Sequence, residues 1–155
     1  MELILFIGLQ ASGKSRFFER RFASTHVLVS KDLWPNARRK EARQQRWVAD
    51  ALSQGKSVVV DNTHPTLAQR APLIALGHAQ GASVIGFYFS SRLEDCLARN
   101  AKRQGRARVP DVALFATAKL LRRPSREEGF DALYRVTLGG DGDFVVEDWK
   151  EERDD

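Results

Sequence analysis

The sequence predicts an α/β fold, a three-layer sandwich with a parallel sheet between two layers of helices. Short and nearly continuous apolar runs alternate with longer segments of helical pattern along the 155 residues. Such runs are typical of parallel strands that are buried on both faces. The first run leads directly into a glycine loop and then into a helical segment, as in doubly wound folds. We therefore expect a single domain over residues 1–155.

The individual elements follow from apolar runs for strands and from glycine and proline signals for helix ends. Strands are expected at residues 3–7, 26–30, 57–61, 83–89, 134–138 and 144–147, the last two around a GGDGD turn. Helices are expected from about 14 to 22, from beyond Pro35-Asn36 to about 54, from the segment 63–66 to about 79, and over about 92–101 and 111–122.

The glycine loop GLQASGKS at residues 8–15 matches the phosphate-binding pattern GxxxxGK[ST] in full. Its glycines let the backbone approach a phosphate closely, and the start of the following helix adds positive charge. Lys14 is expected to reach the β- and γ-phosphates of ATP, and the Ser15 hydroxyl is expected to bind Mg²⁺. The residues expected to contact the nucleotide are Gly8, Ala11, Ser12, Gly13, Lys14, Ser15 and Arg16. A chance match is disfavoured, because the motif lies between a predicted strand and a predicted helix.

Two aspartates follow predicted strands, where ligands bind in open parallel sheets. Asp32 follows the second strand and has two interpretations, a general base for an attacking hydroxyl or a surface-loop residue. Asp61 ends the third strand, and there we favour a metal contact over a helix cap.

Basic residues concentrate in two segments of a chain whose net charge is +5, residues 38–46 and 99–108. Arg99 and Arg103 are four apart and share a helix face if the helix continues. We interpret about 99–110 as a mobile lid that closes over phosphates, with a solvated basic face as the alternative. Residues 147–155 are expected to form an acidic tail.

Composition and cysteine usage restrict the class of protein. There is no apolar run of about 18 residues, and the apolar N-terminal segment lacks a basic region before it, so neither a membrane partner nor a signal peptide is expected. The single cysteine, Cys96, cannot form an internal disulfide, which fits a cytoplasmic location.

The motif set resembles the 5′-polynucleotide kinase family of P-loop kinases, in particular the kinase domain of the polynucleotide kinase/phosphatase type. The resemblance covers about residues 3–136, and it rests on GLQASGKS, VSKD, VVVDNTHP, CLARNAKR, RVP and EEGFDALYRV. It implies an adenylate-kinase-like fold with a lid, with ATP and Mg²⁺ as cofactors.

Roles for individual residues are implied by the same resemblance. Lys14 and Ser15 match the ATP and magnesium residues, and Asp61 matches the acidic residue near the metal. Asp32 matches the general base that activates the 5′-hydroxyl. Arg99 and Arg103 both match the lid arginines that hold the donor phosphates.

The chain also departs from this family. The family's loop commonly has Pro-Gly where this chain has Gln10-Ala11, and the phage enzyme has an arginine where this chain has Pro35. The next basic residues, Arg38 and Arg39, are the candidates for binding the acceptor phosphate. Trp34 is the candidate on which a terminal base stacks.

Three functions are compatible with these observations. The chain could phosphorylate the 5′-OH end of a polynucleotide, DNA or RNA, or a small hydroxyl compound on the same scaffold, or it could bind nucleotide without catalysis. Asp32 argues against the third, because a module that only binds nucleotide needs no base facing the γ-phosphate. The sequence leaves the acceptor and the oligomeric state open.

Overall fold

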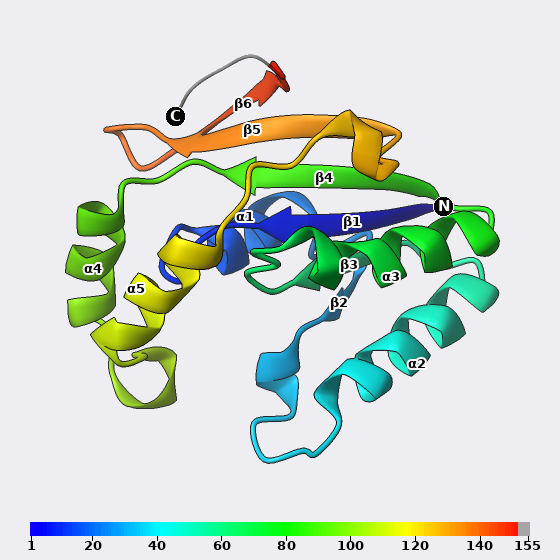
Figure 1. Cartoon of the computed structure of the whole chain (residues 1–155), viewed down its shortest axis with the longest axis horizontal. Coiled ribbons are helices and arrows are strands. Elements are labelled where there is room, and N and C mark those ends of the chain that lie inside the picture. The colour runs from blue at the N-terminus through cyan, green and yellow to red at the C-terminus, as the bar shows by residue number, and fades with distance from the viewer. Residues whose placement is uncertain (152–155) are drawn as a thin grey trace.

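Five parallel strands form most of a six-stranded sheet, and an antiparallel strand closes one edge (Figure 1). The computed structural model describes residues 1–151. The strand order is β2-β3-β1-β4-β5-β6. The strands are β1 Glu2–Ile7, β2 Val27–Val29, β3 Val58–Asp61, β4 Ser83–Phe89, β5 Ala132–Leu138 and β6 Phe144–Asp148. The expected α/β sandwich is thus confirmed.

Five α-helices and three short 3₁₀ turns connect the strands of the described chain. The helices are α1 Lys14–Arg21, α2 Lys40–Ser53, α3 Leu67–Ala79, α4 Leu93–Ala101 and α5 Asp111–Leu120. The turns are η1 Lys31–Leu33, η2 Gly105–Ala107 and η3 Arg126–Glu128. The second helix starts later than the sequence signals suggest, because Arg39 at its N-cap has left-handed backbone with φ of 54°.

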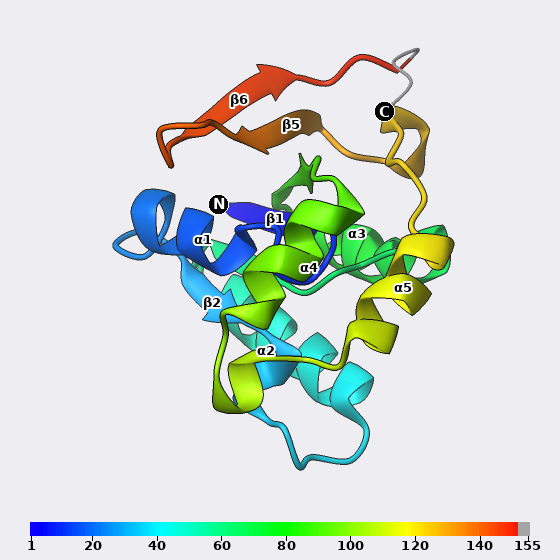
Figure 2. The ribbon, with the colours of Figure 1, turned by 90° about the vertical axis from the view of Figure 1, so that its left-hand side faces the viewer.

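The central strand β1 is apolar on both faces, and alternate side chains enter different cores. Leu3 and Leu5 belong to a core that contains residues of α2 and α3. Ile4 and Phe6 belong to a second core, rich in phenylalanine, that contains residues of α1. Figure 2, turned by 90° from Figure 1, shows α1 and α3 on opposite sides of β1.

Helices α4 and α5 lie beyond the carboxyl ends of the strands (Figure 1). They form a third, smaller core with the loop that follows β1. In it, Leu9 and Ala11 of the loop pack with Cys96 of α4 and Leu114 of α5. This core attaches the expected lid region to the glycine loop.

The segment predicted as an acidic tail, residues 147–155, begins inside the fold. Glu147 and Asp148 end β6, and Trp149 is buried against Tyr88 with their ring centroids 5.5 Å apart. The start of this segment is therefore held in the fold by the burial of Trp149, although its composition is acidic. The remainder of the predicted tail, residues 152–155, lies outside the described residues.

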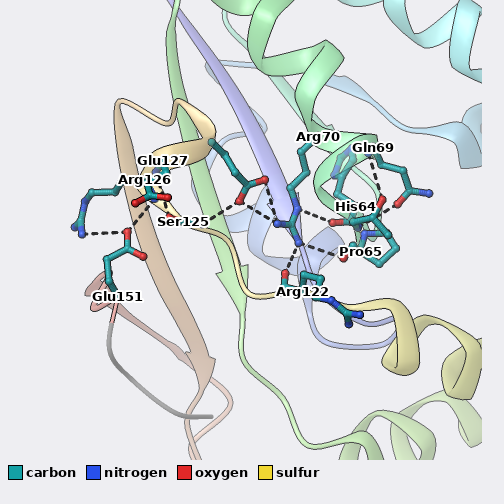
Figure 3. A network of polar contacts seen from close by, with 11 residues as sticks. His64, Pro65, Gln69, Arg70, Arg122, Ser125, Arg126, Glu127 and Glu151 are labelled. Atoms are coloured by element: carbon teal, nitrogen blue, oxygen red, sulfur yellow. Dashed lines mark hydrogen bonds and ion pairs between the residues drawn. The ribbon is translucent and has the colours of Figure 1, made fainter.

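A fully buried arginine, Arg70 of α3, joins the loop after β3 to distant parts of the chain (Figure 3). Its Nε donates to the carbonyl of His64 at 2.9 Å, and its guanidinium also donates to the carbonyls of Pro65 and Arg122. Its charge is paired with Glu128 at 3.1 Å. A buried cation with these partners holds the loop that leaves β3 in one conformation.

Replacing Arg70 by Ala is expected to lower the free energy of unfolding by about 3–5 kcal/mol, because it leaves the buried Glu128 carboxylate without its partner. Urea unfolding measures this change. The matched control is Arg92→Ala, which breaks an exposed ion pair with Glu94 and should change stability by less than about 1 kcal/mol. Equal stabilities for the two variants would contradict this role of Arg70.

Candidate active site

A cleft of about 500 Å³ opens at the carboxyl end of the sheet. Its walls come from the glycine loop, the segments after β2 and β3, the start of α2 and the segment between α4 and α5. The residues that line it are Gln10, Ala11, Lys14, Ser15, Lys31, Asp32, Glu41, Asp61, Asn62, Thr63, His64, Pro65, Gln69, Arg103, Arg106, Ala107 and Val109. Six predicted site residues thus line one cavity: Ala11, Lys14, Ser15, Asp32, Asp61 and Arg103.

The glycine loop has the close contacts that its sequence predicts. A Cβ on Gly8 would lie 2.9 Å from the Phe89 Cβ, so any larger residue would push the loop off β4. Gly13 has a left-handed φ of 99° immediately before α1. Ala11 is also left-handed, with φ of 62°, at the position where the resembling family commonly has glycine. An alanine there costs about 1–2 kcal/mol.

Lys14 is buried, and its side chain folds back onto the loop. Its ammonium donates to the carbonyls of Gly8 at 3.1 Å and Leu9 at 2.6 Å. Burial lowers the pKa of Lys14 to about 8, although the Asp61 carboxylate opposes this shift. Burial therefore destabilises the protonated form of Lys14, and a neighbouring phosphate group would stabilise it.

Ser15 and Asp61 form the contact that joins the loop to β3. The Ser15 hydroxyl donates to Asp61 Oδ2 at 2.8 Å. Burial raises the pKa of Asp61, and Lys14 and the Ser15 hydrogen bond oppose this rise. A hydroxyl and a carboxylate oxygen this close are ligands that fit Mg²⁺, which also keeps waters and phosphate oxygens in its shell.

Asp32 lies in η1 and faces the same cleft. Its turn is tied to the neighbouring strand end, because the Asn62 Oδ1 accepts from the backbone N–H of Lys31 at 3.1 Å. Asn62 in turn donates to Gln44 of α2 at 2.6 Å. The general-base candidate is therefore carried on a turn held by both β3 and α2.

The two predicted lid arginines have different surroundings. Arg99 donates through Nε to the carbonyl of Ala11 at 2.7 Å, so it holds the loop backbone at its strained residue. Arg103 lines the cleft and donates to the Ala107 carbonyl at 3.3 Å. Arg106, on η2, also lines the cleft. The structure thus brings Arg103 to the cavity, whereas Arg99 contacts the loop backbone and does not line the cleft.

The remaining predicted residues lie outside the cleft lining. Arg16 is exposed on α1, and Ser12 is buried with no hydrogen-bond partner for its hydroxyl among the described residues. Arg38 and Arg39 are exposed between η1 and α2. Trp34 is buried, at 8% exposure, and belongs to the core beneath α2, so the structure places it in packing.

Sequence reasoning missed His64, which lines the cleft with the strained backbone φ of 45°. Its Nδ1 hydrogen-bonds to the carbonyl of Phe6 at 2.6 Å, and burial lowers its pKa to about 4, so the ring is neutral at pH 7. Its Nε2 is buried without a partner in the described part of the chain. The spacing of His26, His64 and His78 in the sequence matches no triad or metal pattern, and it carries no information about contacts made across the sheet.

These features define a P-loop protein with the α/β fold of P-loop kinases. The chain matches the AAA domain family over residues 3–124 and belongs to that family.

Within residues 1–151, no helix has the length and apolar character needed to cross a membrane. The same residues contain no group of three or more His, Cys, Asp or Glu side chains that could hold a metal ion.

Known proteins of several activities are similar to this chain. It is 25% identical over 139 residues to a bifunctional polynucleotide phosphatase/kinase of Schizosaccharomyces pombe, covering 87% of this chain and 33% of that protein. The chain therefore spans about a third of the length of this curated relative.

Solved structures share the fold at lower identity. A gluconokinase from Sinorhizobium meliloti 1021 has a TM-score of 0.63 at 18% identity, over 88% of this chain and 82% of that one. A chain of the Pnkp1/Rnl/Hen1 RNA repair complex has a TM-score of 0.65 at 22% identity, over 77% and 43% respectively.

The buried state of Lys14 predicts a pH-dependent affinity for nucleotide. Phosphates favour the ammonium, whereas burial among protein groups favours the neutral amine above a pKa of about 8. Above that pH, binding must take up a proton, so the Kd for a non-hydrolysable ATP analogue should rise by up to about tenfold per pH unit. Calorimetric titrations from about pH 7.5 to 9.5 measure it.

The control for this titration is Lys102→Ala, since Lys102 is exposed and does not line the cleft. This variant should retain the pH dependence of the unmodified chain. A Kd that stays constant over the range would show that Lys14 does not gain its proton from phosphate binding.

Proposed function

We propose that this chain is an ATP-dependent phosphotransferase that moves the γ-phosphate of ATP to a hydroxyl, with the 5′-OH end of a polynucleotide as acceptor. The observation that carries the proposal is the convergence of Lys14, the Ser15–Asp61 pair and Asp32 on one cleft. These groups come from the ends of three neighbouring strands. Together they supply a positive charge for the phosphates, a position for the metal ion and a general base.

Each group has a task in the transfer. The loop N–H groups and Lys14 hold the β- and γ-phosphates, and the Lys14 ammonium leaves its loop carbonyls to do so. Ser15 and Asp61 would hold Mg²⁺, and the chemistry it would supply when bound is neutralisation of charge on the phosphate oxygens. Asp32 accepts the proton of the attacking hydroxyl. The acceptor oxygen bonds to the γ-phosphorus as the bond from that phosphorus to the β–γ bridging oxygen breaks, and ADP leaves.

The lid region contributes from the opposite wall. Arg103 lines the cleft, so its guanidinium is available to stabilise charge on the transferring phosphoryl group. Arg99 acts through the loop, because its hydrogen bond fixes the Ala11 carbonyl. We propose that the segment 99–110 closes when nucleotide binds.

The choice of acceptor rests on two supports. One is the similarity to the bifunctional polynucleotide phosphatase/kinase, whose name states its substrate class. The other is the basic segment 38–46, which begins six residues after Asp32. Phosphates downstream of a reacting 5′ end would meet this positive charge.

A small hydroxyl compound is the second candidate acceptor. It is favoured by the fold similarity to a gluconokinase, and by the position of Arg38 and Arg39 outside the cleft lining. Ionic strength separates the two: binding of a polyanion weakens steeply with salt, and binding of a small neutral acceptor does not.

The Asp32→Asn variant is expected to bind the ATP analogue with unchanged Kd and to transfer phosphate about 10²–10⁴-fold more slowly. The amide retains the shape of the side chain but cannot accept the proton. Single-turnover transfer of labelled γ-phosphate measures the loss. The control is Asp50→Asn on α2, an exposed aspartate that does not line the cleft. If Asp32→Asn weakens nucleotide binding and leaves the transfer rate per bound ATP intact, the base assignment is wrong.

A further inference from the structure

Helix α2, whose first turn lines the cleft at Glu41, carries an exposed tryptophan, Trp47, which does not line it. The chain has three tryptophans, and two of them are buried: Trp34 at 8% and Trp149 at 3% exposure. Trp47 is 46% exposed, so nearly half of a large aromatic side chain faces solvent. Such exposure leaves an apolar flat surface without a protein partner on that side.

The packing beneath Trp47 supports its ring. Trp34 contacts it edge-to-face with ring centroids 5.1 Å apart. The Arg43 guanidinium lies over the Trp34 ring at 5.7 Å, one helical turn before Trp47 on the same face of α2. Trp34 follows Asp32 by two residues, so this aromatic pair adjoins the turn that carries the proposed base.

The segment that contains Arg43 and precedes Trp47 is rich in cations. Arg38, Arg39 and Arg46 are exposed, and together with Lys40 and Arg43 they give five cations between residues 38 and 46. Acidic groups on α2 are fewer: Glu41, which pairs with Lys31, and Asp50. An exposed aromatic ring within positive charge has the chemistry that binds a single nucleic-acid strand, with bases stacked and phosphates paired.

The proposal rests on the polynucleotide kinase function above and extends it. We propose that Trp47 is a stacking platform for a base downstream of the reacting 5′ end of a single strand. Glu41 is the residue of α2 that lines the cleft. Trp47 lies six residues further along the helix, which is a rise of about 9 Å. A strand must therefore leave the cleft to reach Trp47, so the contact is made by oligonucleotides and not by a single nucleoside.

The test measures binding without ATP. A 5′-OH octanucleotide, as DNA and separately as RNA, should quench the tryptophan emission of the unmodified chain. Trp47→Ala should abolish the quenching and raise the Kd for the 3′-labelled octanucleotide, measured by anisotropy, by about 5- to 150-fold, and Trp47→Phe should recover part of the affinity. Phe115→Ala on α5 is the control, because Phe115 is 47% exposed on a different helix.

Kinetics give the second readout. In Trp47→Ala the KM for the octanucleotide should rise while the KM for ATP and the KM for a nucleoside 3′-phosphate stay unchanged. If the unmodified chain phosphorylates the octanucleotide but Trp47→Ala binds it equally well, this inference is wrong and the proposed function stands. If the unmodified chain neither binds nor phosphorylates the octanucleotide, yet phosphorylates a small acceptor, both the inference and the polynucleotide assignment are overturned.

Discussion

The hydrogen bond from Ser15 to Asp61 is the contact on which the rest of the site depends. The register of the parallel pair sets Phe6 of β1 opposite Asp61 of β3, so the loop that leaves β1 passes over the carboxylate. A second bond, from the Gly8 N–H to the Thr63 carbonyl at 3.0 Å, joins the same two segments. With the loop fixed in this way, Lys14 is buried and its charge is destabilised, which is the electrostatic state that favours an incoming phosphate.

Much of the fold could be predicted because its signals are local. Continuous apolar runs marked the strands, and the glycine loop marked the strand-to-helix junction at Gly8 and Lys14. Topology then brought Asp32 and Asp61 to the same cleft, since parallel strands end at one edge. The buried Arg70 network could not be predicted in this way, because its partners lie 52 and 58 residues away in sequence and depend on tertiary packing.

Exposure was the other property that sequence patterns did not reveal. Trp34 had the appropriate position after Asp32 for base stacking, but its burial depends on how the segment before α2 folds against the core. In the structure the exposed tryptophan is Trp47, whose ring packs edge-to-face against Trp34. Arg99 likewise has the spacing of a lid arginine, while its hydrogen bond to Ala11 depends on the packing of α4 against the loop. A residue's chemistry could be read from sequence, but its accessibility could not.

Phosphoryl transfer to a polynucleotide 5′ end can be measured directly by following the label from ATP. The chain is incubated with γ-labelled ATP and Mg²⁺, and in parallel with 5′-OH oligonucleotides, nucleosides and sugars including gluconate, over a range of salt concentrations. Labelled oligonucleotide is expected as the dominant product, with a yield that falls steeply as salt increases. Label on a nucleoside or sugar alone, independent of salt, would contradict it.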